Sequence, residues 1–102
     1  MTKLAIWATM QAKPGREAEA AEFLVEACRR IEAEPGTTHF FSIDLGDGKF
    51  AIFNAMADQD AFLAHVGGEI AAWTQAMNPE LFTEPYAITR GDVLAVKPQK
   101  AG

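Results

Sequence analysis

The sequence predicts an α+β fold in which a four-stranded antiparallel sheet carries its helices on one face. Three observations predict it. Three segments have the composition and alternation of strands, an amphipathic helical pattern follows the first of them, and a glycine-rich turn joins the other two. With a fourth strand expected in the tail, the order becomes β-α-β-β-α-β, which is the ferredoxin-like arrangement.

The first half of the chain supplies a strand and the longest helix. Residues 4–12 place apolar side chains at every second position, which is typical of a strand, and Lys13-Pro14-Gly15 ends it. Residues 16–33 repeat apolar positions at spacings of three and four, which predicts an amphipathic helix. Glu34-Pro35-Gly36 then breaks this helix.

The second half begins with a hairpin. Residues 37–45 and 49–56 are rich in β-branched and aromatic side chains, and Gly46-Asp47-Gly48 between them suits a tight loop. Asp58 is the expected N-cap of a short helix that ends at Gly67-Gly68. A further helical piece is expected over residues 69–77, closed by Asn78-Pro79. The tail is expected to be extended over residues 85–88 and, more clearly, over residues 92–96.

Composition limits the class of protein. At 102 residues, one domain over residues 1–102 is expected, with an ordered core of about residues 3–97. The net charge of −5 and the lack of a basic cluster larger than Arg29-Arg30 predict no nucleic-acid partner. Apolar stretches fall far short of the ~20 residues that span a bilayer, and no leader pattern is apparent. We therefore expect no membrane association and a cytoplasmic location.

Metal and disulfide chemistry have little support. Cys28 is the single cysteine, so neither an internal disulfide nor a cysteine cluster is available, and a packed thiol is expected. The two histidines, His39 and His65, lie far apart in sequence and have no third ligand at a metal-binding spacing. No metal site is predicted.

The sheet face away from the helices is unusually apolar. A sheet that is buried on one side normally alternates apolar and polar residues, but here Trp7, Phe41 and Phe53 fall opposite other apolar residues of the same strands. Left uncovered, such a face would be a large exposed apolar patch, which favours association with another protein surface. We expect a second copy of the chain to cover it in a face-to-face homodimer.

Five segments, in order and over nearly the whole chain, resemble the antibiotic biosynthesis monooxygenase (ABM) domain family: AKPGRE, EPGT, FAIFNAMAD, AHVGGEIAAW and DVLAVK. The resemblance implies a dimeric α+β barrel with a pocket in each protomer between its sheet and its helices. Members include small oxygenases that oxidise quinols or polycyclic phenols with O2 without metal or flavin, and others degrade haem.

Cofactor-free oxygenation of a phenol requires a dry cavity, a proton acceptor and hydrogen-bond donors for the phenolate oxygen. His65, Asn54 and His39 are the candidate catalytic residues. His65 shares a helix face with Phe62 and matches the family's His-x-x-Gly stretch. The alternatives are structural: His65 closes its helix, His39 serves the core or the interface, and Asn54 ties strand to helix.

Aromatic side chains are the candidates for contact with a flat substrate, and the same residues at strand and helix spacing are also typical of a core. The candidate substrate-binding residues are Trp7, Phe41, Phe53, Phe62, Trp73 and Tyr86.

The predicted function is a small monooxygenase that uses no cofactor and oxidises a quinol-like or polycyclic phenolic compound with O2. One alternative within the fold is a haem-binding or haem-degrading protein. Another is a non-enzymatic dimer that binds a small hydrophobic metabolite.

Overall fold

The computed structural model of the protein describes residues 2–97, so the outermost residues of the predicted domain lie outside the described part. The sheet has the order β2-β3-β1-β4, and all of its pairings are antiparallel. The elements are β1 (Leu4–Gln11), α1 (Glu17–Ile31), β2 (Thr37–Gly46), β3 (Lys49–Met56), α2 (Gln59–Val66), α3 (Glu69–Leu81) and β4 (Ala87–Asp92).

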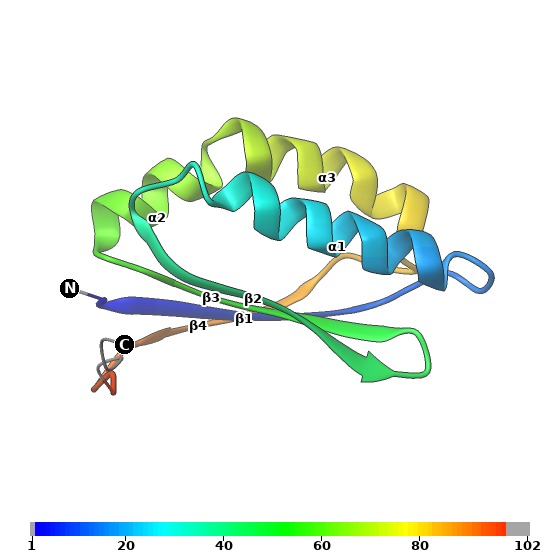
Figure 1. Cartoon of the computed structure of the whole chain (residues 1–102), viewed down its shortest axis with the longest axis horizontal. Helices are drawn as coiled ribbons and strands as arrows, with labels where there is room; N and C mark the ends of the chain where they lie inside the picture. The colour runs from blue at the N-terminus through cyan, green and yellow to red at the C-terminus, as the bar shows by residue number, and fades with distance from the viewer. Residues whose placement is uncertain (1, 98–102) are drawn as a thin grey trace, which may run out of the picture.

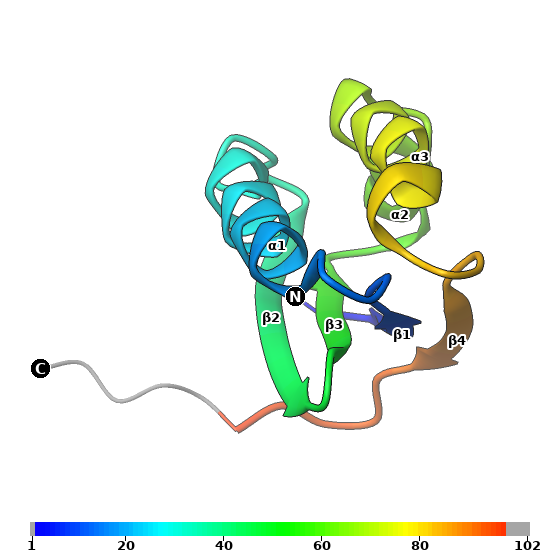
Figure 2. The same cartoon turned by 90° about the vertical axis from the view of Figure 1, so that its right-hand side faces the viewer.

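The molecule has two layers, with every helix on one face of the sheet (Figure 1). Viewed end-on, α1 lies over the β2–β3 side, and α2 and α3 lie over the β1–β4 side (Figure 2). The α+β, ferredoxin-like fold expected from the sequence is confirmed. The order is β-α-β-β-α-α-β, because Gly67-Gly68 separates two helices where the predicted order counted one.

The local signals of the hairpin and of α2 are confirmed. Gly46, Asp47 and Gly48 all have positive φ angles, of 90°, 54° and 76°, which glycine and aspartate tolerate best. Asp58 caps α2, because its side chain accepts a hydrogen bond from the N–H of Ala61 at 2.9 Å. These turns fix the register of β2 on β3 and the start of α2.

The predicted end of α3 is wrong. The helix continues through Pro79 to Leu81, although proline removes one backbone hydrogen bond from the last turn. Leu81 and the following Phe82 are buried in the core, and the N–H of Phe82 donates to the carbonyl of Asn78 at 2.9 Å. Packing of these two side chains therefore outweighs the local preference of Asn78-Pro79 to end the helix.

Of the two extended segments predicted for the tail, residues 85–88 overlap the last strand, but the one predicted more clearly, residues 92–96, does not form it. β4 is Ala87–Asp92, and residues 93–97 belong to no strand. In the antiparallel pairing Asp92 lies opposite Leu4, the first residue of β1, so the chain beyond Asp92 has run past its partner. One backbone bond, from Val93 to Lys3, continues the pairing, and Leu94 is almost fully exposed.

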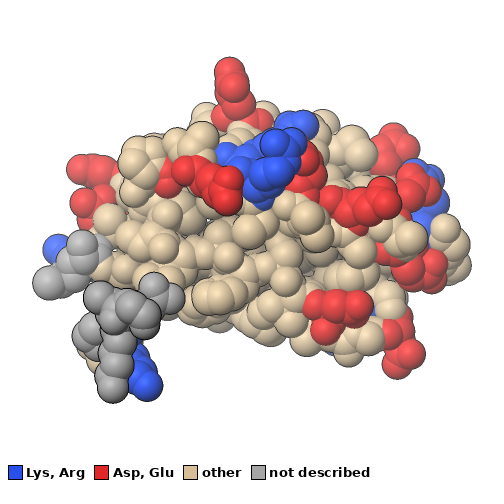
Figure 3. All heavy atoms as spheres, in the orientation of Figure 1, with Lys and Arg blue, Asp and Glu red and all other residues tan. Residues whose placement is uncertain are grey.

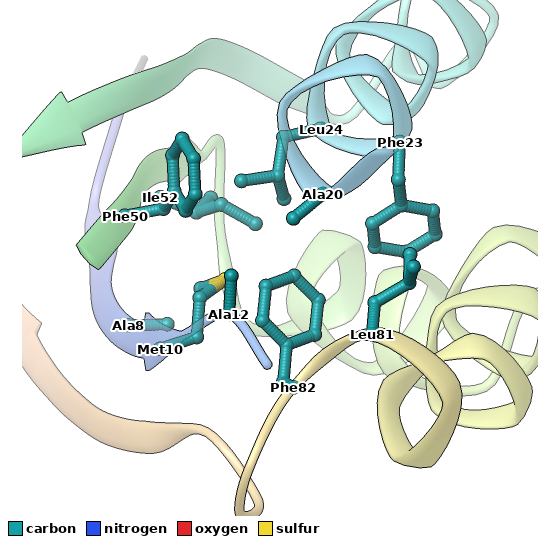
Figure 4. Close-up of a cluster of buried hydrophobic side chains, with 10 residues drawn as sticks. All are labelled: Ala8, Met10, Ala12, Ala20, Phe23, Leu24, Phe50, Ile52, Leu81 and Phe82. Carbon is teal, nitrogen blue, oxygen red and sulfur yellow. The ribbon is translucent and has the colours of Figure 1, made fainter. Parts of the chain in front are cut away.

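A cluster of core side chains packs α1 and the end of α3 against β1 and β3 (Figure 4). Phe23 from α1 and Phe82 after α3 have ring centroids 6.1 Å apart, and Met10 of β1 is buried with them. The core cluster contains Ala8, Met10, Ala12, Ala20, Phe23, Leu24, Phe50, Ile52, Leu81 and Phe82. Another part of the space between the layers contains a cavity.

The opposite face of the sheet is apolar and open. Trp7 pairs with Phe53, which pairs with Phe41, and this row points away from the helices. Trp7 is 39% exposed and Phe41 is 53% exposed. In the view of Figure 3, most of the charged side chains lie over the helix layer instead.

We expect Leu24→Ala to lower the free energy of unfolding by about 2–5 kcal/mol, because it opens a cavity in the core cluster. The neighbouring Val25→Ala is the matched control. Val25 is exposed on the same helix, so its replacement should change stability by less than about 0.5 kcal/mol. Urea unfolding of both variants measures the difference, and equal losses would contradict the placement of the core.

Candidate functional site

A cavity of about 270 Å³ lies between the sheet and the helices. It exists because α2 has no buried residue and α3 buries only Leu81, so these helices do not fill the space above the sheet. Small side chains such as Ala8, Ala27 and Ala71 enlarge it. Its lining residues are Ile6, Ala8, Ala27, Ile31, Phe40, Ile52, Asn54, Phe62, His65, Val66, Ile70, Ala71, Thr74, Gln75, Tyr86 and Ile88.

His65 is held between two polar partners at one end of this cavity. Its Nδ1 lies 2.7 Å from Oε1 of Glu34, and its Nε2 lies 3.4 Å from Nδ2 of Asn54. A carboxylate only accepts hydrogen bonds, so Nδ1 of His65 carries a proton and donates it to Glu34. The side chains of His65 and Glu34 are 14% and 20% exposed, so little water competes for their contact.

The turn after α1 positions Glu34. Thr37 donates its hydroxyl hydrogen to the same Oε1 at 3.0 Å, which fixes the carboxylate. A Cβ atom at Gly36 would lie 2.6 Å from the Cβ of Ala61, so only glycine lets this turn lie directly against α2. The close approach brings Glu34 to the last turn of α2, where His65 projects.

Asn54 stands on the cavity floor with one polar atom unpaired. It is 4% exposed on β3, and it pairs with Ile6 on one side and Phe40 on the other. Nδ2 contacts His65, but the buried Oδ1 has no hydrogen-bond partner. Buried polar atoms are normally paired, so this oxygen is an exception among the polar atoms of the site.

Tyr86 brings a second unpaired group to the cavity. It packs edge-on against Phe82, with ring centroids 5.7 Å apart, and its buried hydroxyl has no partner. Burial raises the pKa of Tyr86 to about 12, because the charged phenolate would lose its hydration. The hydroxyl therefore stays protonated at neutral pH.

His65 also reaches the molecular surface. A hollow formed by the turn after α1 and the outer side of α2 is lined by Glu34, Asp60 and His65, among others. His65 is the one residue that lines both this hollow and the cavity. The imidazole thus faces the cavity with one nitrogen and the acidic surface hollow with the other.

The structure places some of the residues predicted to act on a substrate in the lining of the cavity and others away from it. His65, Asn54, Phe62 and Tyr86 line the cavity together. Arg90 lies over the Phe62 ring, 4.3 Å from its centroid.

Trp73 belongs to the edge of the core and does not line the cavity. Its ring lies 4.7 Å from that of Phe23, and the guanidinium of Arg30 lies 3.8 Å from its centroid. Trp7, Phe41 and Phe53 are on the open face of the sheet, as is His39, whose Nδ1 contacts the Thr38 hydroxyl at 3.0 Å. These four residues cannot line the cavity of their own chain.

Sequence reasoning missed Glu34, Thr37 and Phe40 as site residues. Glu34 was interpreted only as part of a helix-breaking turn, although EPGT is one of the five family-like segments. That segment was the available signal, since a carboxylate in a tight turn is free to face the helix that packs on it.

Residues 2–97 contain neither a cluster of metal ligands nor a helix that could span a membrane. No three His, Cys, Asp or Glu side chains gather there in a way that would hold a metal ion. None of the helices in that range combines the length and apolarity needed to cross a membrane.

Among known proteins, the chain is similar to proteins of solved structure. No family model and no curated protein matches the chain. The protein NE2512 of Nitrosomonas europaea, of unknown function, is 40% identical to this chain with a TM-score of 0.91, and the match covers 99% of this chain and 98% of that one.

Two further structures are named as candidate antibiotic biosynthesis monooxygenases. The one from Caulobacter crescentus is 18% identical, with a TM-score of 0.82 and coverage of 92% of both chains. The other, from Nitrosomonas europaea, is 16% identical, with a TM-score of 0.79 and coverage of 90% of both chains. At these identities the likeness concerns the fold.

The chain shares its fold with NE2512 and with the two candidate monooxygenases, in agreement with the fold that the sequence resemblance implied. The chain belongs to the same family as NE2512 of Nitrosomonas europaea.

The titration of Tyr86 is directly measurable because it is the only tyrosine. Tyrosinate absorbance near 295 nm should appear around pH 12 in the folded protein, against about 10 for an exposed tyrosine. The unfolded chain loses this proton first, so the free energy of unfolding should fall as pH rises from about 10 to 12.

Tyr86→Phe is the control for both measurements. It should remove the absorbance change and flatten this part of the stability profile. Ionisation of the folded wild type near pH 10 would contradict the burial of the hydroxyl.

Proposed function

We propose that the protein is a small cofactor-independent monooxygenase that oxidises a quinol-like or polycyclic phenolic compound with O2. The observation that carries the proposal is the position of His65, whose ring lines an apolar cavity while its Nδ1 lies 2.7 Å from Oε1 of Glu34. The names of the two candidate monooxygenases with this fold support the reaction class.

Deprotonation of the substrate hydroxyl is the first step. Nε2 of His65 accepts the proton as general base, and the carboxylate of Glu34 stabilises the imidazolium that forms. Nδ2 of Asn54, which lies 3.4 Å from Nε2, can turn its N–H to the phenolate oxygen. The phenolate is then held by a donor in a largely apolar space.

Oxygen then reacts with the bound phenolate. One electron passes from the phenolate to O2, which gives a phenoxyl radical and superoxide, and these combine by forming a C–O bond at a ring carbon that carries hydrogen. The peroxide takes up one proton, and loss of water breaks the O–O bond and forms a carbonyl. Overall, the phenol and O2 give a quinone and water, and each product receives one of the two atoms of O2.

The proton has a route out of the cavity. His65 receives it at Nε2 and can release the other proton from Nδ1 to Glu34, which lines the surface hollow. Glu34 is therefore a positioning residue that also connects the base with solvent.

The size of the cavity favours a small substrate. A cavity of about 150 Å³ holds benzene in another protein, so 270 Å³ suits a two-ring compound. Drug-sized ligands use pockets of about 300–1,000 Å³, so a porphyrin would require the layers to open further. A Soret shift with micromolar haem would favour the haem alternative over the phenolic substrate.

Oxygen uptake with two-ring quinols as substrates tests the proposal. His65→Ala should lower kcat by about 10²–10⁴-fold, the usual contribution of a general base. Glu34→Gln should lower it less, because an acceptor oxygen remains beside Nδ1 while the charge is lost. Glu22→Gln, on the exposed side of α1, is the matched control and should not change the rate.

A variant of the second histidine tests which of the two predicted histidines takes part in the reaction. His39→Ala should retain the wild-type rate, because His39 lies on the other face of the sheet. Equal uptake by wild type and His65→Ala would remove His65 from the mechanism. Binding of the whole panel without oxygen uptake would favour the non-enzymatic binding protein.

We propose also that the open face of the sheet joins a second copy of the chain. The support is the row of Trp7, Phe53 and Phe41, which is apolar and half-exposed at its ends. The same surface on both copies makes a self-complementary interface. The ABM-like architecture implied by the sequence resemblance is a dimer of this kind.

Sedimentation analysis tests the dimer. Phe41→Glu places a charge within the proposed interface and should shift the mass from two chains to one. Val25→Glu adds the same charge on the exposed face of α1 and should leave the mass unchanged. A wild-type protein that is monomeric at micromolar concentration would contradict the proposal.

A further inference from the structure

The cavity between the sheet and the helices opens on one side of the molecule. Most of its lining residues are buried or half-buried, and three are exposed: Val66 of α2, Gln75 of α3 and Ile88 of β4. Val66 is 45% exposed and Ile88 is 63% exposed. Lining residues that also meet solvent mark the place where a cavity opens. The mouth therefore lies between the edge strand β4 and the two helices above it (Figure 2).

Arg90 stands beside this mouth on the edge strand. In the antiparallel pairing Ile88 lies opposite Ala8, and Arg90 lies opposite Ile6. Ile6 and Ala8 both line the cavity between the sheet and the helices. Residues that lie opposite each other in a sheet point to the same face, so Ile88 and Arg90 point toward the helices. Arg90 is thus the next residue on that face of β4 after the exposed Ile88.

The Arg90 side chain crosses from the edge strand to α2. Its Nη2 donates a hydrogen bond to Oε1 of Gln59, in the first turn of α2, and its guanidinium carbon lies 4.3 Å from the centroid of the Phe62 ring. Phe62 lines the cavity one helical turn before Val66. Among the described residues, the bond to Gln59 is the only side-chain hydrogen bond that joins β4 to a helix.

This contact can open without leaving a buried group unpaired. Arg90 and Gln59 are both exposed, so water can replace each of them as the hydrogen bond breaks. No carboxylate among residues 2–97 pairs with Arg90, so its release separates no ion pair there. α2 contains no buried residue, so little packing holds Phe62 and its helix in place when Arg90 lets go.

We propose that the gap between β4 and the helices is the entrance to the cavity, and that Arg90 closes it by holding Phe62 and Gln59 across the gap. A ligand passes when Arg90 releases these two side chains, and the contact forms again behind it. Arg90 is a positioning residue, because it acts on entry through Phe62 and does not line the cavity. The inference concerns the exchange of ligand and goes beyond the proposed reaction.

Rates of ligand exchange under nitrogen test the inference. The probe is 2-naphthol, whose own fluorescence reports binding in a stopped-flow instrument. The contact is present before and after passage and broken during it. Arg90→Ala should therefore raise the association and dissociation rate constants by the same factor, about tenfold, and leave Kd within about twofold. Gln59→Ala should raise both by about threefold, and it should add nothing in the Arg90→Ala background, because its partner is already gone.

Arg16→Ala is the matched control. It removes an arginine that pairs with Glu19 at the start of α1, away from the mouth, so it should leave both rate constants unchanged. Circular dichroism checks the fold of each variant, and Gln59→Ala, a change on the surface of α2, carries the test if Arg90→Ala does not fold.

Three results would overturn the inference: equal exchange rates in wild type and variants, a change of Kd through the dissociation rate alone, or no binding of 2-naphthol by the wild type. Faster exchange in the variants without oxygen uptake in air would support the entrance and count against the monooxygenase. Oxygen uptake with unchanged exchange rates would do the reverse.

Discussion

The contact between Glu34 and His65 is the interaction on which the site depends. It joins the turn after the first helix to the end of the second helix, and it determines which imidazole nitrogen faces the cavity. The contact requires the turn and the helix to touch, which Gly36 against Ala61 makes possible. A side chain at position 36 would push the turn after α1 away from α2. The imidazole of His65 would then lose its orientation, although no residue that lines the cavity had been replaced.

The same few positions explain how an amide and an imidazole come together at one end of the cavity. Asn54 is the one buried polar residue of the described chain, and it lies where β1, β3 and β2 place Ile6 and Phe40 beside it. An amide among apolar neighbours is tolerated because Nδ2 has the imidazole as partner. The unpaired Oδ1 is the remaining penalty.

Much of the fold could be predicted from the sequence because its signals are local. Asp58 and the Gly46–Gly48 loop act through their own backbone, and the structure agrees with both. The errors arose where distant contacts decide: Leu81 and Phe82 carry α3 past Pro79, and β4 stops where β1 begins. His65 and Asn54 were recognisable as polar residues in apolar patterns. Glu34 was not, because its role depends on a partner 31 positions away.

The core cluster and the cavity lining overlap only in part, which has a consequence for how the sequence can vary between related proteins. Ala8 and Ile52 belong to both sets, whereas the large core side chains Phe23 and Phe82 do not line the cavity. Ile70, Ala71 and Ile88 can therefore vary in size with little effect on folding, while the acid–imidazole pair stays in place. One scaffold of about a hundred residues is thereby able to diversify in what it accepts without first gaining stability.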